Sequence, residues 1–369
     1  MAKAQRLLSL DVFRGMTIMM MIIVNNPGNW GFVFSPLLHS KWNGCTPTDL
    51  VFPFFMFIMG TAMYYSFKKY NFLLNWKSVN KVIIRTLLIF LIGILLNAFP
   101  FINADLSHMR IMGILPRIAI AYGITSLIIL SLRITYVKII TIVILIGYWL
   151  LLMIFGGNDP YSLNDNFVRT FDIFILGANH LPSHSGVVFD ITGLLSTLPS
   201  IASVLFGFFI GRIIDNSENS RIAVIKILIN GLILIIAGMA WNLVFPINKP
   251  LWTSSFVLYT SGWAMIIFSL LLWIIDVKGY RNWTNPMLCF GLNPLFIYVM
   301  ACVWADILGL IKIRTHFGKF ITLKDWMFSH IFSPIAGNMI GSLLFAIHLA
   351  LIFWLIGWFL KRKQIYIKI

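Results

Sequence analysis

Apolar residues fall in blocks of about twenty along the whole chain, the length that a helix needs to cross the hydrocarbon core of a bilayer. Short polar connections separate these blocks. The Asn293-Pro294 pair in the middle of the ninth block predicts a kink. We therefore predict an all-α bundle in one transmembrane domain, 1–369, with ten spans near 9–27, 50–67, 82–100, 113–132, 136–154, 191–213, 223–245, 252–275, 287–311 and 337–360.

Composition and charge indicate the class of protein and its orientation. Hydrophobic residues make up 59% of the chain and charged residues 11%, whereas a soluble domain has about a quarter charged residues. Most of the net charge of +16 comes from one alternate set of loops, which includes Lys3, Arg6 and Lys361. The positive-inside rule therefore places both termini in the cytoplasm and the loop around His39 outside. We expect a multi-pass protein of a bacterial inner membrane, surrounded by lipid and with no nucleic-acid partner.

The residue inventory excludes several kinds of site. The three cysteines and seven histidines lack the spacings of metal ligands, so we expect no metal. The chain has no glycine-rich phosphate loop and no nucleophile elbow. Glu218 is the only glutamate, which excludes a mechanism with paired glutamates. The remaining candidates are the polar residues at the ends of the spans.

A polar loop at 39–49 leads directly into the apolar run 50–59. The loop begins with His39, and Asn25 and Asn26 stand at the end of the preceding span. Polar groups at membrane depth are costly unless they are paired, so this cluster indicates a site. From these residues alone, catalysis by His39 and a structural hydrogen bond within the loop are equally open.

Further polar residues recur at span ends, and each has a structural alternative. Asp11 and Arg14 are spaced i,i+3 and can pair on one helix face. Arg117 lies one turn into the fourth span, where an internal salt bridge and a phosphate or thioester contact are both open. Asp190 is interpreted as a cap at the start of the sixth span. Trp252 is typical of an interface anchor, but the serines that follow it enter an apolar helix.

These segments together resemble the heparan-α-glucosaminide N-acetyltransferase family of transmembrane acyltransferases. The resemblance runs in order along almost the whole chain, through Ser9-Leu10-Asp11-Val12-Phe13-Arg14-Gly15, Val24-Asn25-Asn26, His39, Trp42-Asn43-Gly44, Thr46, Asp49-Leu50-Val51-Phe52-Pro53-Phe54, 110–117, 194–199, 248–255 and the tail 363–368. Two positions depart from the family's usual pattern. Pro116 stands where Gln is common, and Asp190-Ile191-Thr192-Gly193 replaces Asp-Pro-Glu-Gly.

The resemblance implies transfer of acetyl from cytoplasmic acetyl-CoA to a sugar amine across the membrane, with His39 as the catalytic imidazole. His39 acts either as a general base or as a carrier that itself takes the acetyl group. Asn25 either orients the imidazole or donates to the oxyanion, with Asp49 and Ser254 in reserve. Expected contacts of the donor are Arg14, Arg117, Ser254 and Asn293, and those of the sugar are Asn26, Trp42, Asn43, Asp49 and Trp252. Because the chain lacks the long outer domain of the lysosomal members, we expect a small amino sugar or a cell-envelope sugar.

Two other functions stay open at this point. A permease for an amino sugar or its acetylated form would also use kinked helices with polar groups at the midplane, although the His39 motif has no counterpart in the second half. The same machinery could instead acylate a hydroxyl of an envelope glycan. A homodimer is the protein partner that we consider.

Overall fold

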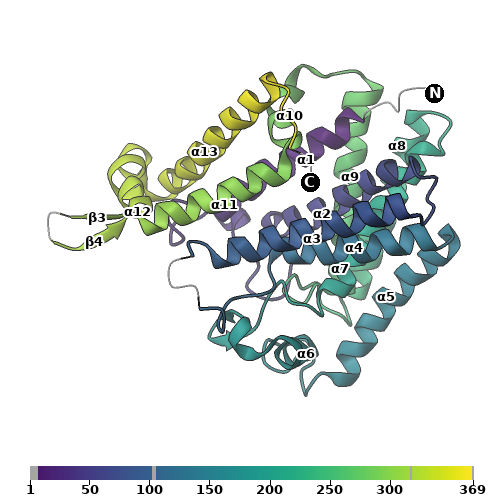
Figure 1. Ribbon diagram of the computed structural model, residues 1–369, viewed down its shortest axis with the longest axis horizontal. Helices are drawn as coiled ribbons and strands as arrows, with labels where there is room; N and C mark the ends of the chain where they lie inside the picture. The colour runs from purple at the N-terminus through teal and green to yellow at the C-terminus, as the bar shows by residue number, and fades with distance from the viewer. Residues whose placement is uncertain (1–6, 102–104, 316–317, 368–369) are drawn as a thin grey trace. The chain divides into compact units, whose positions relative to one another are not determined.

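The computed structural model describes residues 7–101, 105–315 and 318–367. Lys3 and Arg6, used above for the orientation, and Lys368 of the tail motif lie outside the described residues. The described chain is predominantly helical (Figure 1). The α-helices are α1 (Leu8–Asn25), α2 (Pro47–Lys68), α3 (Trp76–Ala98), α4 (Ile114–Ser131), α5 (Ile134–Phe155), α6 (Phe167–Leu176), α7 (Thr197–Asp215), α8 (Ser220–Trp241), α9 (Ser254–Leu271), α10 (Asn285–Gly291), α11 (Pro294–Leu310), α12 (Leu323–Met327) and α13 (Ser333–Arg362).

The β-strands of the described chain form two small antiparallel hairpins. β1 (Ser183–His184) pairs with β2 (Val187–Val188), and β3 (Lys312–Arg314) pairs with β4 (Phe320–Thr322). Short π-helical segments extend α9 through Leu272–Val277 and join α12 to α13 through Phe328–Phe332. Neither hairpin adds a strand to a larger sheet, so the fold class is all-α, as predicted.

The predicted spans are confirmed as helices. Within the described ranges, nine helical segments are long and apolar enough to cross a membrane, and the pair α10–α11 supplies a tenth. This pair is bent by 67° at its break, which confirms the kink predicted at Asn293-Pro294. The chain is therefore an all-α polytopic membrane protein.

The chain divides into two compact units. Unit 1 lies within residues 1–39, 46–52 and 279–368, and unit 2 lies within residues 40–45 and 53–278. Unit 1 thus holds α1, the first turns of α2, and α10 to α13 (Figure 1). Unit 2 holds the rest of α2 and α3 to α9.

In unit 1, glycine allows α1 and α10 to approach at backbone distance. A Cβ atom on Gly15 would lie 1.8 Å from the carbonyl oxygen of Met287, so only glycine fits there. The chain that follows α1 is tied to α13, because the amide of Gly28 donates to the carbonyl oxygen of Ser342 at 3.0 Å. These two contacts hold α1 at its middle and the chain just beyond its C-terminal end.

In unit 2, the same device brings α2 and α7 together. A Cβ atom on Gly60 would lie 1.8 Å from the carbonyl oxygen of Val204. The hydroxyl of Thr61 donates to the carbonyl oxygen of Gly207 at 3.0 Å across the same crossing. Two further helix pairs, α3 with α4 and α8 with α9, run side by side (Figure 1). Close crossings of this kind leave little room for α7 to shift against α2.

The sixth span begins later than the sequence predicts. The predicted span starts at 191, but α7 starts at Thr197, and residues 190–196 form turns and irregular backbone. The carbonyl oxygen of Gly193 accepts hydrogen bonds from Arg117 Nη2 at 3.3 Å and from the Thr197 hydroxyl at 2.8 Å. This backbone therefore accepts hydrogen bonds from buried side chains in place of the backbone hydrogen bonds of a helix. The interpretation of Asp190 as a helix cap is wrong for the same reason.

Candidate functional site

His39 lies beside a buried carboxylate in unit 1. Its Nδ1 atom is 2.7 Å from Oδ1 of Asp49, whose side chain is 1% exposed, whereas the His39 side chain is 44% exposed. An ionised carboxylate only accepts hydrogen bonds, so Nδ1 of the imidazole donates and carries the proton. In the neutral ring, Nε2 then carries the lone pair, which is the arrangement that a general base requires.

The same carboxylate also closes the start of α2. Its Oδ2 atom accepts from the amide of Thr46 at 3.0 Å, and the Thr46 hydroxyl lies 3.1 Å away. Thr46 directly precedes the helix, so a residue in the first turn reaches back to it, as in a capping box. Asp49 was expected to contact the sugar, but both of its oxygens face groups of its own chain. This geometry favours an orienting role for Asp49.

Asn25 and Asn26 end α1 in the same unit. Asn25 is exposed, and its side chain hydrogen-bonds to no other residue in the described part of the chain. The imidazole is therefore oriented by Asp49, and of the two alternatives for Asn25 the oxyanion donor is the one that the geometry leaves open. Asn26 uses its amide nitrogen to donate to the carbonyl oxygen of Ile22 at 2.8 Å, which satisfies the end of the helix.

Two expected donor-binding residues of unit 1 lie around the α10–α11 break. Arg14 Nη1 is 3.1 Å from Asp11 Oδ1, as the i,i+3 spacing predicts, and 3.5 Å from the carbonyl oxygen of Gly291. Asn293 is buried, and its side chain donates to the carbonyl oxygen of Ile365 at 3.0 Å. Its Oδ1 atom also accepts from the tail at 2.7 Å. Asn293 thus anchors the C-terminal tail at the bend.

The loop segment Trp42-Asn43 is held inside unit 2. Trp42 Nε1 donates to the carbonyl oxygen of Tyr161 at 2.8 Å, and its ring packs edge-on against Phe189. Oδ1 of Asn43 accepts from the amide of the Asn248 side chain at 3.0 Å. Trp42 and Asn43 are thus fixed by contacts within unit 2, and their expected contact with the sugar stays a prediction.

Arg117 is fully buried in the first turn of α4. Its guanidinium lies 4.9 Å from the centre of the Trp252 ring, a cation–π contact, and Nη2 hydrogen-bonds to Ser196 and Gly193. Among the residues that the structure describes, its Nε and Nη1 atoms have no hydrogen-bond partner. Trp252 is also buried and is not an interface anchor. Arg117 and Trp252 therefore belong to one polar site inside unit 2.

A second arginine neutralises Asp190. Arg110 makes two hydrogen bonds to this carboxylate, Nε to Oδ2 at 2.9 Å and Nη2 to Oδ1 at 2.6 Å. The amide of Thr192 donates to Oδ1 at 2.7 Å. Burial alone would raise the pKa of Asp190, but Arg110 and Thr192 hold it below its ordinary value. This bidentate pair fixes the segment 190–196 against which Arg117 packs.

Asp172 on α6 is a site residue that the sequence did not indicate. Its Oδ1 atom accepts from the amide of Leu195 at 2.9 Å, while Oδ2 is buried without a hydrogen-bond partner among the described residues. A Cβ atom on Gly193 would lie 1.8 Å from that oxygen, which explains the glycine. Burial raises the pKa of Asp172 to about 6, against the opposing influence of Leu195 and Arg117.

This pKa predicts a pH dependence of stability. Because the folded pKa of about 6 exceeds the ordinary 3.8, the folded state binds more protons between these values, so stability falls as pH rises from about 4 to about 6. Asp172→Asn removes the titrating group, so up to ~3 kcal/mol of this pH-dependent loss of folding stability should be absent in the variant. The measurement is the melting temperature of the detergent-solubilised protein against pH, with the exposed Asp165→Asn as control. Parallel curves for Asp172→Asn and the wild type would contradict the assignment.

Ser254 lies at the start of α9 and is buried. Its hydroxyl donates to the carbonyl oxygen of Leu145 at 2.7 Å and so joins α9 to α5. The preceding Thr253 caps the helix by accepting from the amide of Phe256. The hydroxyl of Ser254 is thus engaged within unit 2, and its expected contact with the donor stays a prediction.

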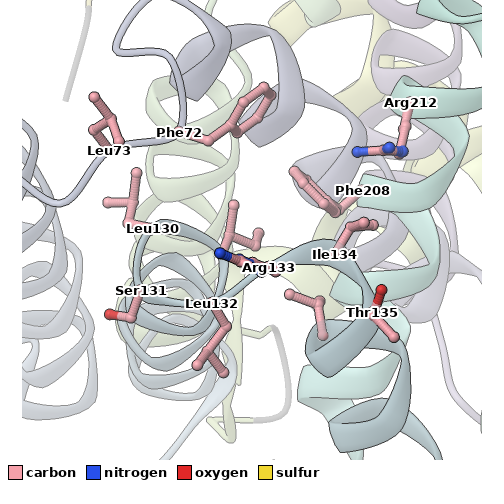
Figure 2. Close-up of a pocket in the computed structure, with 12 residues that line it drawn as sticks. Phe72, Leu73, Leu130, Ser131, Leu132, Arg133, Ile134, Thr135, Phe208 and Arg212 are labelled. Carbon is pink, nitrogen blue, oxygen red and sulfur yellow. The ribbon is translucent and has the colours of Figure 1, made fainter.

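At the other end of α4, unit 2 contains a cavity of about 560 Å³ (Figure 2). Arg133 from the α4–α5 turn and Arg212 from α7 border it, together with the rings of Phe72 and Phe208. No carboxylate is among its described lining residues. Phe72 has a left-handed φ of 53°, an uncommon conformation for a bulky residue, and packs against Phe208. Two guanidinium groups beside aromatic rings suit an anion that carries a planar ring.

A sequence profile of heparan-alpha-glucosaminide N-acetyltransferase, catalytic region, matches residues 6–244. The chain belongs to this family. It is 30% identical over 355 residues to heparan-alpha-glucosaminide N-acetyltransferase of Mus musculus, covering 81% of this chain and 53% of that protein. The Homo sapiens protein of the same name is 28% identical over 351 residues, covering 80% and 52%. The chain thus spans about half the length of the curated relatives it matches.

The part of the chain that matches the acetyltransferase profile contains the His39–Asp49 pair, Arg117 and the newly found Asp172. It ends before Trp252 and Ser254. The family profile therefore covers the proposed base and the buried arginine.

The sequence contains a signal for the helix that carries Asp172, although not for Asp172 itself. Asn166 accepts from the amide of Arg169, and Phe167 and Phe171 follow at helical spacing, so the pattern of a capped amphipathic helix is present between α5 and α7. The helix is short, and its single buried carboxylate is conspicuous only when residues 193–195 are folded against it.

Proposed function

We propose that this chain transfers acetyl from cytoplasmic acetyl-CoA to the amine of a glucosamine-type sugar on the outer side of the membrane. The observation that carries the proposal is the His39–Asp49 pair, an oriented and accessible imidazole, in a chain of an N-acetyltransferase family. The two curated relatives are named for transfer of an acetyl group to a glucosaminide nitrogen.

In the proposed reaction the sugar amine attacks the carbonyl carbon of the thioester. His39 Nε2 removes a proton from the attacking nitrogen, and the Asp49 carboxylate stabilises the imidazolium that forms. The tetrahedral intermediate collapses with cleavage of the C–S bond, and the imidazolium returns its proton to the departing thiolate. The exposed amide of Asn25 is the candidate donor to the oxyanion. General-base help of this kind is worth about 10²–10⁴-fold in rate.

The donor is an anion with a ring system at one end and a thioester at the other. The basic cavity of Arg133 and Arg212 suits its phosphates and adenine, and by the positive-inside rule this end of unit 2 is cytoplasmic. Arg117 lies near the opposite end of α4, where its unused Nε and Nη1 donors suit a thioester carbonyl. Arg14 is a further candidate for the phosphates.

The test uses the purified protein in sealed proteoliposomes with labelled acetyl-CoA on one side and sugars on the other. Label should appear on the amine of glucosamine and not on N-acetylglucosamine or on glucose. Uptake of sugar without acetylation would support a permease, and label on hydroxyl groups would support an O-acyltransferase. Acetyl exchange between acetyl-CoA and free CoA in the absence of sugar would indicate an acetyl-histidine intermediate.

A further inference from the structure

A long groove on unit 2 shares only Arg212 with the described lining of the cavity above. It encloses about 840 Å³ between α5, α7, α8 and α9. On α5 its lining residues recur at Lys138, Thr141, Ile142, Leu145, Ile146 and Trp149, which is the spacing of one helix face. The groove therefore runs along the helices instead of across them.

One end of the groove is basic. Lys138 near the start of α5, Lys226 near the start of α8 and Arg212 near the end of α7 all line it. The three side chains are exposed, and none makes a hydrogen bond or ion pair with a carboxylate in the described ranges. The lining residues of the groove include no aspartate or glutamate among those described. This end thus attracts an anion.

The wall beyond the basic end is apolar over a defined length. From Lys138 to Trp149, α5 rises about 16 Å at 1.5 Å per residue. The hydrocarbon of one leaflet is about 15 Å deep, half of the bilayer core. The exposed side chains of Ile142 and Ile146 line this stretch. An acyl chain that starts at the basic end would therefore remain in contact with the wall across its own leaflet.

Aromatic side chains close the far end. The rings of Trp149 and Trp241 meet edge-on with centroids 5.8 Å apart, joining α5 to α8. Trp149 Nε1 donates to the hydroxyl of Tyr161 at 3.0 Å, which fixes the indole. The groove thus has a basic end, an apolar stretch along α5 and an aromatic end at Trp149 and Trp241.

We propose that this groove binds one anionic phospholipid, with its headgroup phosphate at Lys138 and Lys226 and one acyl chain along α5. Basic pockets between transmembrane helices bind anionic headgroups by the same combination of charge and apolar contact. The length of the apolar stretch favours a ligand with an acyl chain, because a free phosphate or a detached headgroup would contact only the basic end. The proposal does not depend on acetyl transfer.

Native mass spectrometry of the detergent-solubilised protein tests the site. Phosphatidylglycerol should bind with at least tenfold preference over phosphatidylcholine of the same chain length, and glycerophosphoglycerol, which lacks the chains, should not bind. The double variant Lys138→Gln/Lys226→Gln should weaken phosphatidylglycerol binding about twentyfold, since each lysine near an anionic headgroup contributes roughly a fivefold factor. The matched control Lys69→Gln/Lys77→Gln removes two exposed lysines outside the groove and should bind as the wild type does.

A second variant tests the acyl chain. Ile142→Trp fills the exposed part of the wall and leaves the lysines in place, so it should also weaken phosphatidylglycerol binding while thermal stability without lipid stays unchanged. Equal binding of the two lipids, or undiminished binding by both variants, would overturn the proposal. It would also be overturned if the wild type were a dimer that Ile142→Trp dissociates, because a second copy of the chain would then occupy the groove.

Discussion

Replacing His39 by alanine is expected to abolish acetyl transfer while CoA binding and the melting temperature stay close to those of the wild type. The imidazole is half-exposed and its partner Asp49 also accepts from the amide of Thr46, so the start of α2 should persist without the ring. The expected fall in kcat is about 10²–10⁴-fold. Steady-state kinetics and CoA titration of the purified variant measure both effects. Residual turnover above a tenth of the wild-type value would remove His39 from the mechanism.

Asp49→Asn separates orientation from capping at the same position. The amide oxygen can still accept from the Thr46 amide, so α2 should start as before. The amide nitrogen would instead donate to Nδ1 of His39, which moves the ring proton to Nε2 and removes the base. We expect kcat to fall by about 10²–10⁴-fold with a changed pH profile and an unchanged melting temperature. A stable variant with the wild-type pH profile would contradict the orienting role.

The chain provides a matched control for this pair. His108 and Asp105 form an exposed histidine–aspartate contact of 2.6 Å between α3 and α4. His108→Ala removes an imidazole of the same kind far from the start of α2 in sequence, and it should leave kcat within twofold of the wild-type value.

The second large effect is expected at Arg117. Its two unused donors are fully buried, and an unsatisfied buried donor costs about 1–3 kcal/mol, so a ligand carbonyl or phosphate that accepts from them gains that energy. Lysine would keep the charge but lose the planar fork and the stacking on Trp252. Arg117→Lys should raise the KM for acetyl-CoA about tenfold and leave the KM for the sugar nearly unchanged, and Arg117→Ala should be nearly inactive.

Controls separate this effect from misfolding. Arg117→Ala removes a positive charge that stabilises the buried Asp172 carboxylate, so this variant should lose stability as well as activity for a reason unrelated to the donor. The double variant Arg117→Met/Asp172→Asn removes both charges and should therefore be inactive but better folded than Arg117→Ala. Arg169→Lys, on α6, is a matched substitution that should change neither KM. A defect confined to the sugar would move Arg117 to the acceptor pocket, and an unchanged KM for both substrates would make it structural.

Much of the fold could be predicted because apolar block length directly reflects bilayer thickness. The break at Asn293 also follows from local chemistry, since Pro294 has no backbone N–H to donate to the preceding turn of a helix. The start of α7 could not be predicted, because the carbonyl oxygen of Gly193 is taken by Arg117 from a distant helix. A sequence pattern shows which residues favour a helix and not which distant side chain competes for its backbone.

The candidate site was predictable only in part for a related reason. His39 and Asp49 lie ten positions apart, and their pairing depends on how the loop 40–46 returns to α2. The prediction gives Asn25 as the first candidate to orient the imidazole or to donate to the oxyanion, with Asp49 in reserve, and the structure gives the hydrogen bond to the imidazole to Asp49. Asp172 was overlooked, because its buried environment is created by the Gly193 segment folding against α6.

The double use of the Asp49 carboxylate links proton chemistry to helix fraying. The oxygen that aligns the imidazole belongs to a side chain whose other oxygen fastens the first turn of α2. Whenever that turn opens, the ring is released, so the fraction of molecules with an aligned base equals the fraction with a closed turn. First turns open at a smaller free-energy cost than whole domains. Warming should therefore lower the fraction of molecules with an aligned His39, and with it the activity, at temperatures where the membrane helices are still folded.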